Sequence, residues 1–192
     1  DGGSCLLSRS STNTSMPLLI RMDSLGNILW ANTYVGGGFT IKAADLIENK
    51  KEEFVVEYGL NVAESPGTFL FVRKDGTFRL NKTVGQTTYY NFCETTDDNY
   101  VMVGLNSSFS FSSFKCVKFD SLGNVLLEKN IQLRPASTHL PYVVTATSNG
   151  GWIVGGGIVE RGPFLVKCDA LGNIYPAQLK GDAIFDLSHD CV

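Results

Sequence analysis

The stretch Asp120-Ser121-Leu122-Gly123-Asn124 decides the fold, because the chain repeats it. It returns as Asp23-Ser24-Leu25-Gly26-Asn27 and as Asp169-Ala170-Leu171-Gly172-Asn173, with a shortened copy at Asp75-Gly76-Thr77. An Asp side chain can start a turn, and Gly takes the positive φ that other residues resist. Because each copy lies between two apolar runs, the motif predicts a β-hairpin. The Asp residues follow one another after 52, 45 and 49 residues, which indicates a tandem repeat of about 48 residues.

A second recurrent element precedes each hairpin. Phe54–Gly59, Tyr100–Gly104 and Trp152–Gly156 are Val- or Gly-rich, and each follows a short polar turn that is itself preceded by an apolar segment. Each repeat therefore holds four short strands. Several of these strands are apolar on both sides, which indicates sheets that are covered on both faces.

Four-stranded antiparallel units in tandem are typical of the blades of a β-propeller. We expect an all-β, single-domain β-propeller over residues 1–192, with four blades of four antiparallel strands. The first blade comprises residues 1–35 plus 183–192, because the chain opens inside a blade and closes on a segment that matches a first strand. This closing segment completes the first blade either intramolecularly or from a neighbouring chain. The other blades span residues 41–84, 89–132 and 141–180.

The run from Phe164 to Ile174, together with Ser148 to Gly156, resembles the β-propeller repeats of large secreted and cell-surface proteins that are common in Bacteroidota. It is also distantly similar to the blades of quinoprotein (PQQ-type) propellers. Quinoprotein enzymes need a calcium-holding carboxylate cluster and aromatic stacking on the cofactor. The chain has two Trp residues in unrelated strand positions and no such cluster, so we expect no cofactor and no metal.

Composition limits the class of protein. The net charge of −3 argues against a nucleic-acid surface, and no apolar run approaches the length of a membrane span. Abundant Gly, Ser, Thr and Asn with 18% charged residues suit an extracellular or cell-surface all-β domain. The chain begins at Asp1 without an initiator Met, so we expect a processed product or a piece of something longer.

The five cysteines show no CxxC spacing, which argues against a zinc site. Cys93, Cys116 and Cys168 lie inside strand runs and are expected to be small buried hydrophobes. Cys5 and Cys191 would lie on neighbouring strands if the C-terminal segment completes the first blade, so we predict a disulfide between them.

The second-to-third and blade-to-blade connections are longer and irregular and fall on one face, opposite the short turns, and function usually resides on such loops. The candidate residues for binding a protein or glycan partner on this long-loop face are Phe39, Tyr89, Phe109, Phe111, Arg134 and His139. The alternative is that these side chains fold back and cover the gaps between blades. Asn13, Asn81 and Asn106 begin triplets that fit the N-glycosylation pattern.

No catalytic constellation is visible in the sequence. There is no G-x-S-x-G nucleophile elbow, and the repeated Asp residues are better explained as turn initiators than as calcium ligands. Asp45, Glu94 and Asp186 lie in first strands, where they could form an acidic site in a central channel. We expect the chain not to be an enzyme.

The resulting hypothesis is a non-enzymatic extracellular interaction or structural module, adhesin-like or a subunit of a surface assembly or fibre. Head-to-tail self-association through the terminal strands is one form of such an assembly. Two alternatives stay open: a carbohydrate-binding, lectin-like propeller, and a hydrolase or lyase that uses the channel site.

Overall fold

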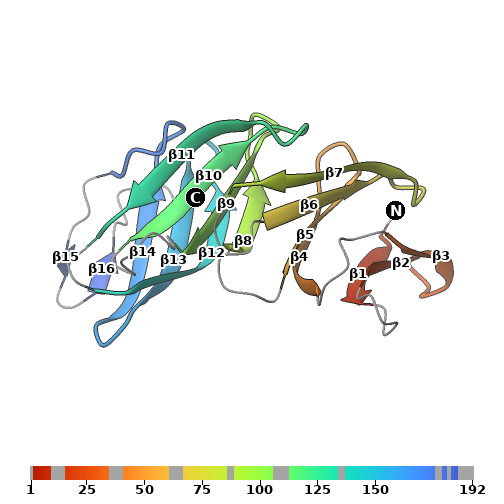
Figure 1. Cartoon of the computed structure of the whole chain (residues 1–192), viewed down its shortest axis with the longest axis horizontal. Coiled ribbons are helices and arrows are strands. Elements are labelled where there is room, and N and C mark those ends of the chain that lie inside the picture. Colours follow the sequence, from red (N-terminus) through yellow and green to blue (C-terminus); the bar gives the residue numbers. More distant parts are fainter. Residues whose placement is uncertain are drawn as a thin grey trace. The chain divides into compact units, whose positions relative to one another are not determined.

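The computed structural model describes residues 2–9, 16–34, 41–60, 67–85, 89–105, 113–133, 137–175, 179–180 and 183–185 (Figure 1). These residues form strands and turns, and none of them lies in a helix. No segment among them is therefore a helix long and apolar enough to span a membrane. The chain divides into two compact units, Asp1–Gln86 and Thr87–Val192, which are treated separately below.

The first unit contains two antiparallel sheets. Sheet 1 has three strands in the order β1-β2-β3, and sheet 2 has four strands in the order β4-β5-β6-β7. Their bounds are β1 Ser4–Arg9, β2 Pro17–Met22, β3 Ile28–Thr33, β4 Ile41–Glu48, β5 Phe54–Leu60, β6 Gly67–Val72 and β7 Phe78–Val84. Each strand pairs with the next one along the chain, so both sheets are meanders.

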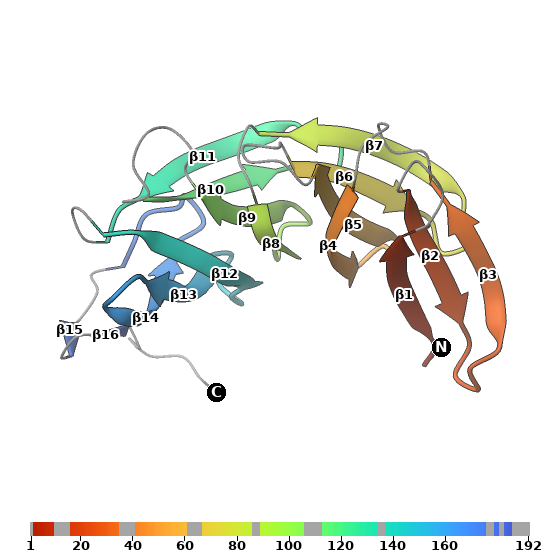
Figure 2. The same ribbon diagram turned by 60° about the horizontal axis from the view of Figure 1, so that its bottom comes forward.

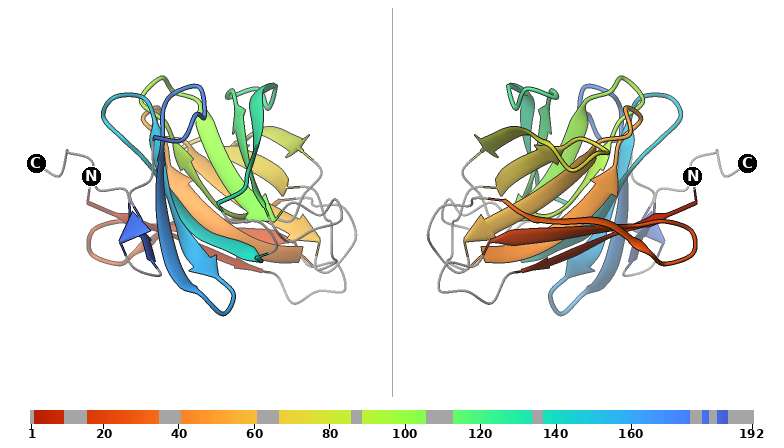
Figure 3. Two further views of the ribbon diagram at one scale, coloured as in Figure 1. Left: turned by 90° about the vertical axis from the view of Figure 1, so that its left-hand side faces the viewer. Right: turned by 90° about the vertical axis from the view of Figure 1, so that its right-hand side faces the viewer.

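The second unit contains sheet 3, in the order β8-β9-β10-β11, and sheet 4, in the order β12-β13-β14-β16-β15. Their bounds are β8 Tyr89–Glu94, β9 Tyr100–Leu105, β10 Phe114–Phe119, β11 Val125–Ile131, β12 His139–Ala146, β13 Trp152–Ile158, β14 Gly162–Cys168, β15 Leu179–Lys180 and β16 Ala183–Phe185. The β15 and β16 strands are the short dark-blue arrows in Figure 3. The prediction of an all-β chain with four sheets is confirmed, and this arrangement fits a propeller-like architecture.

Each unit has a core between its two sheets. In the first unit, Leu19 of sheet 1 packs with Phe54, Val56 and Leu70 of sheet 2, all almost fully buried, and the Trp30 ring meets Phe54 edge-on at 5.9 Å. In the second unit the core joins sheets 3 and 4. The side chains that form it are Val101, Val103, Phe114, Cys116, Ile131, Val144, Trp152, Val154, Ile158, Phe164, Val166 and Cys168. Alternate residues of each strand therefore enter one sheet-to-sheet core.

The short turns share one backbone geometry. In the Asp120 turn, the N–H of Asp120 donates to the carbonyl of Asn124, and the N–H of Gly123 donates back to the carbonyl of Asp120. Gly123 has a φ of 79°, in the left-handed region where Gly is favoured. Asp120 Oδ1 also accepts from the N–H groups of Leu122 and Asn124, at 2.9 and 2.8 Å. The Asp23 and Asp169 turns repeat these contacts, which confirms the prediction that these Asp residues initiate turns.

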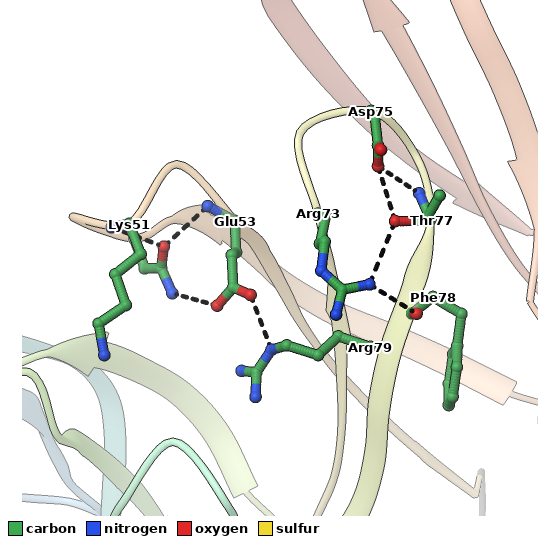
Figure 4. A network of polar contacts seen from close by, with 8 residues as sticks. Lys51, Glu53, Arg73, Asp75, Thr77, Phe78 and Arg79 are labelled. Atoms are coloured by element: carbon green, nitrogen blue, oxygen red, sulfur yellow. Dashed lines mark hydrogen bonds and ion pairs between the residues drawn. The ribbon is translucent and has the colours of Figure 1, made fainter.

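The turn of sheet 2 corrects the predicted register. Arg73, and not Asp75, takes the initiating position, because its N–H donates to the carbonyl of Thr77 and its carbonyl accepts from Gly76. Asp75 instead lies at the tip, where Oδ1 accepts from the backbone N–H and the hydroxyl of Thr77 (Figure 4). The repeat is therefore defined by turn geometry and a left-handed Gly, while the Asp side chain is one of two ways to stabilise it.

The C-terminal segment also differs from the prediction. We expected residues 183–192 to supply the first strand of sheet 1. In the structure, β16 pairs in parallel with β14, with Ile184 opposite Phe164 and Phe185 opposite Leu165. The antiparallel partner of β14 ends early: Ile174 bridges Cys168, Tyr175 donates to Lys167, and residues 176–178 lie outside the described part. The remaining edge of β14 accepts β16, which satisfies backbone groups there. Residues 186–192 lie outside the described part.

Candidate functional site

The predicted binding residues of the long-loop face fall mostly outside the described part of the chain. This holds for Phe39, Phe109, Phe111 and Arg134. Tyr89 begins β8 opposite Gly104, and its side chain is likewise outside the description. A binding site made of these residues therefore stays a prediction.

His139 is not on an exposed surface, which corrects its assignment to the binding face. It is the first residue of β12, opposite Ile158, and is 0% exposed. Its ring meets Phe164 edge-on, with the ring centroids 6.3 Å apart. The reason is that β12 begins earlier than predicted, so that His139 belongs to the strand that supplies Val144 to the core. His139 is thus a packed side chain of sheet 4.

Asn81 is also poorly placed for the predicted modification. It is half-buried in β7, and its Nδ2 donates to the hydroxyl of Tyr58 at 2.7 Å. Nδ2 is the atom that would carry a glycan, so glycosylation would require this hydrogen bond to be broken and the side chain to leave the sheet. The structure therefore speaks against glycosylation of folded Asn81. Asn13 and Asn106 lie outside the described residues.

The cysteines behave as apolar side chains. Cys116 and Cys168 are buried in the core of the second unit, and burial raises the pKa of Cys168 to about 12. The expectation of small buried hydrophobes is confirmed for both, whereas Cys93 is only half-buried. Cys5 is half-buried, and burial raises its pKa to about 11. Its predicted partner, Cys191, lies outside the described residues, so the disulfide stays a prediction.

Two of the three acidic residues proposed for a channel site, Asp45 and Glu94, lie on separate sheets. Asp45 is half-buried in β4, where Oδ1 accepts from the N–H of Leu46 at 2.9 Å. Glu94 ends β8, and Asp186 is outside the described part. Among the residues that the structure describes, no group of three or more His, Cys, Asp or Glu side chains could hold a metal ion.

A feature that we did not predict is the docking of one turn on the neighbouring sheet. In the first unit, the Gly76 turn of sheet 2 lies against β3 and the residue that follows it. The carbonyl of Gly76 accepts from the Tyr34 hydroxyl at 2.8 Å and from Asn32 Nδ2 at 3.2 Å, and the carbonyl of Lys74 accepts from Trp30 Nε1 at 3.0 Å. A Cβ on Gly76 would lie 2.7 Å from Asn32 Nδ2 and 2.9 Å from Trp30 Cδ2. The absence of a side chain is what permits this contact.

The second unit repeats the arrangement. A Cβ on Gly172, in the turn of sheet 4, would lie 3.0 Å from Lys129 Cγ and 3.1 Å from Leu127 Cδ2 of β11. Leu127 and Lys129 occupy the positions in β11 that Trp30 and Asn32 occupy in β3, as the pairings with β10 and β2 show. In both units the turn that follows the third strand of the second sheet, β6 or β14, is therefore seated on the outer strand of the first sheet.

The Gly26 turn of sheet 1 has no such seat. A Cβ on Gly26 would meet nothing within 4 Å, and Leu25 beside it is 86% exposed. The strand that follows also exposes apolar side chains, with Ile28 at 64% and Leu29 at 58%. Sheet 1 thus displays, uncovered, the same structural element that sheets 2 and 4 bury.

Polar contacts connect the two turns at one end of sheet 2 (Figure 4). Asn49 Oδ1 accepts from the N–H groups of Lys51 and Glu53, and the Glu53 carboxylate lies 2.7 Å from Arg79 Nε. The Arg79 guanidinium also stacks over the Phe71 ring, 4.5 Å from its centroid. These contacts connect the two turns of one sheet to each other.

Comparisons with known proteins identify the fold. No family model and no curated protein matches the sequence. A protein of unknown function from Bacteroides caccae is 13% identical over 92% of this chain and 61% of its own, with a TM-score of 0.56. An ACO/RPE65 chimera is 14% identical over 90% of this chain and 45% of its own, with a TM-score of 0.53. A mutant of Synechocystis apocarotenoid oxygenase (ACO) is 15% identical over 89% of this chain and 45% of its own, with a TM-score of 0.52.

These likenesses correct one expectation. We expected the chain not to be an enzyme, yet two of the solved structures that share its fold are an apocarotenoid oxygenase and a chimera built from one. Excluding an enzyme from this architecture was therefore wrong, because the same scaffold supports chemistry elsewhere. The chain spans less than two thirds of each of these proteins. At such low identity, the likeness describes the fold.

Proposed function

We propose that the chain is an extracellular β-propeller module whose four sheets are blades and whose long connections bind a partner protein. The observation that supports this proposal most is the division of sheets 1, 2 and 3 into two different ends; in sheet 4 the connection from β13 to β14 is a short turn of residues 159–161. At one end, side chains and a left-handed residue, which is Gly in most turns and Glu52 or Asp98 in two, stabilise five-residue turns. The other end carries the connections that are longest and least regular in the sequence.

Both ends follow from the meander topology. In sheet 2, the turns after β4 and after β6 lie at one end, so the connection from β5 to β6, residues 61–66, lies at the other. In sheet 3, residues 106–112 connect β9 to β10 in the same way and include Phe109 and Phe111. A rigid scaffold that holds variable connections on one side is suited to recognition, because little chain entropy is lost when the partner binds.

The extracellular part of the proposal is supported by composition. The chain is rich in Gly and has 18% charged residues, and it resembles the repeats of secreted and cell-surface proteins. A solved structure that shares the fold comes from Bacteroides caccae, in agreement with the resemblance to repeats that are common in Bacteroidota. A module of this kind would act as an adhesin-like domain or as a subunit of a surface assembly.

The experiment is a binding screen followed by matched variants. The purified chain is screened against arrays of surface proteins and of glycans, and each ligand found is titrated against F109A, F111A and, as the control, L126A. Leu126 is 53% exposed on β11, away from the loops. We expect a protein ligand whose affinity falls at least about tenfold in either Phe variant and is unchanged in the control. Equal binding by all three variants would contradict the proposed face, and glycan-only binding would replace the protein partner with a sugar.

A further inference from the structure

Sheet 1 is incomplete at one edge. Among the described residues, β1 pairs only with β2. In the other three sheets the strand equivalent to β1 has a second neighbour, since β4, β8 and β12 pair with β5, β9 and β13. Figure 2 shows β1 at the margin of its sheet. The first unit therefore presents a sheet edge where the repeat normally holds another strand.

Within the described part of the chain, one face of sheet 1 is also only partly covered. The pairings align Ser4 and Leu6 of β1 with the first and third residues of β5, β9 and β13. In those strands the aligned residues are buried to at least 98%: Phe54 and Val56, Tyr100 and Met102, Trp152 and Val154. In β1, Ser4 is exposed and Leu6 is 50% exposed. The small Ser4 leaves room where the other sheets place an aromatic ring.

Sheet 4 carries the complementary surface. On its face away from the core, Val143 is 50% exposed, and Ile153, Leu165 and Lys167 are half-buried. In sheet 1 the residue aligned with Lys167 is Arg21, which is 2% exposed and lies over the ring of Phe54 in sheet 2, 5.5 Å from its centroid. Sheet 4 thus has a face equivalent to the face of sheet 1 that packs on sheet 2, and this face of sheet 4 is partly exposed.

We propose that the free face of sheet 1 in one copy docks on the free face of sheet 4 in a second copy. This inference rests on the proposed propeller module, and it names one partner of that module as the chain itself. Each unit has a core in which one sheet packs face to face on the next sheet of the repeat. We therefore expect the exposed face of one repeat to bind the face of another.

Such a contact is heterologous, because different surfaces of the two copies meet. It leaves one free sheet 1 and one free sheet 4 on every dimer, so it continues into a ring or a linear chain. The apolar residues Leu6, Ile20 and Met22 would supply the area on one side, and Val143, Ile153 and Leu165 on the other. The interaction is therefore expected to be driven mainly by apolar burial and to persist in high salt.

Sedimentation of the full 192-residue chain over a wide concentration range tests the proposal. We expect concentration-dependent association that L6R and V143R each weaken about a hundredfold, because either change buries an unpaired cation in an apolar contact. The matched control is L126R, since Leu126 is 53% exposed against 50% for Leu6 and 50% for Val143. The control should associate like the parent chain, and circular dichroism should show the same fold in all four proteins.

Mixing the two variants gives the sharpest result. L6R keeps an intact sheet 4 and V143R keeps an intact sheet 1, so the mixture should form a heterodimer that cannot grow further. A strictly monomeric parent chain would overturn the proposal, as would a mixture in which no heterodimer forms. If the F109A and F111A variants lose partner binding but self-associate like the parent chain, the partner site and the self-association surface are independent of each other.

Discussion

The Gly76 turn and the Gly26 turn have the same backbone geometry and opposite surroundings. Both place Gly in the left-handed region, with φ of 83° and 84°. Gly76 is seated against Trp30, Asn32 and Tyr34, whereas Gly26 faces open space. The difference shows that the turn has two separate roles. It closes a hairpin wherever it occurs, and it joins neighbouring sheets only where an outer strand receives it.

The largest effect is expected from removing the ring beneath a seated turn. Trp152 is 0% exposed, belongs to the core of the second unit and would lie 3.4 Å from a Cβ on Gly172. W152A should lower the free energy of unfolding by about 3–5 kcal/mol, because it leaves a large cavity. Chemical denaturation measures this. The control L171A, at the 68% exposed tip of the same turn, should change stability by less than about 0.5 kcal/mol.

The most direct comparison is G76A against G26A. Both substitutions place a Cβ at positive φ, which costs about 1–2 kcal/mol. Only G76A adds a clash with Asn32 and Trp30, worth about a further 1–3 kcal/mol. Thermal and denaturant unfolding of the two variants should therefore differ by about 1–3 kcal/mol. Equal losses would mean that the seating of the Gly76 turn contributes nothing to stability.

A smaller effect is expected from the hydroxyl that holds the seated turn. Tyr34 is 7% exposed, and its hydroxyl donates to the Gly76 carbonyl at 2.8 Å. Y34F removes that donor and should cost about 1 kcal/mol, since the carbonyl still accepts from Asn32. A double-mutant cycle with G76A checks the contact. Additive losses would show that the hydroxyl acts independently of the turn.

The smallest effect concerns acid stability in a turn that uses no Asp cap. Burial raises the pKa of Asp97, but hydrogen bonds from Lys118, Thr95 and Asn99 outweigh it, so the pKa lies well below its usual range. Because the folded-state pKa is lowered, this stabilisation is present above the unfolded-state pKa of about 3.9 and is lost as pH falls below it. The free energy of unfolding of D97N should therefore depend less on pH between pH 5 and 2 than that of the parent chain, by less than about 1 kcal/mol. Denaturant titrations at several pH values measure this. A pH profile of D97N equal to that of the parent chain would show that titration of Asp97 does not contribute to acid unfolding.

Much of the scaffold was predictable from the sequence. The segments starting at Phe54, Tyr100 and Trp152 begin strands β5, β9 and β13 at those same residues. They were identifiable because an apolar run between two polar turns has few alternatives to a strand. The Asp75 register was predicted wrongly, since a left-handed Gly fixes the turn and an Asp near it can occupy more than one position.

The candidate site was less predictable, because exposure depends on which sheets meet. His139 looked like a loop residue, yet an early start of β12 carries it into the core. Asn81 matched a modification pattern, but its amide donates to Tyr58, which lies two strands away in the same sheet. The bare Gly26 turn and the seated Gly172 turn share the pattern Asp-x-Leu-Gly-Asn, so no local pattern separates them. Only the identity of the neighbouring strand does.

The outer strand β3 has a consequence for how the chain must be made. Its residues, Ile28 to Thr33, include no charged side chain, whereas β7 carries Arg79 and Lys82 and β11 carries Glu128 and Lys129. Among the described residues, β3 pairs only with β2, so its other edge is open and lacks the charges that usually discourage aggregation. Part of its cover, the Gly76 turn, is synthesised more than forty residues later. A nascent chain that pauses before residue 76 would therefore be prone to aggregation, and a single Lys in place of Ala31 should protect it.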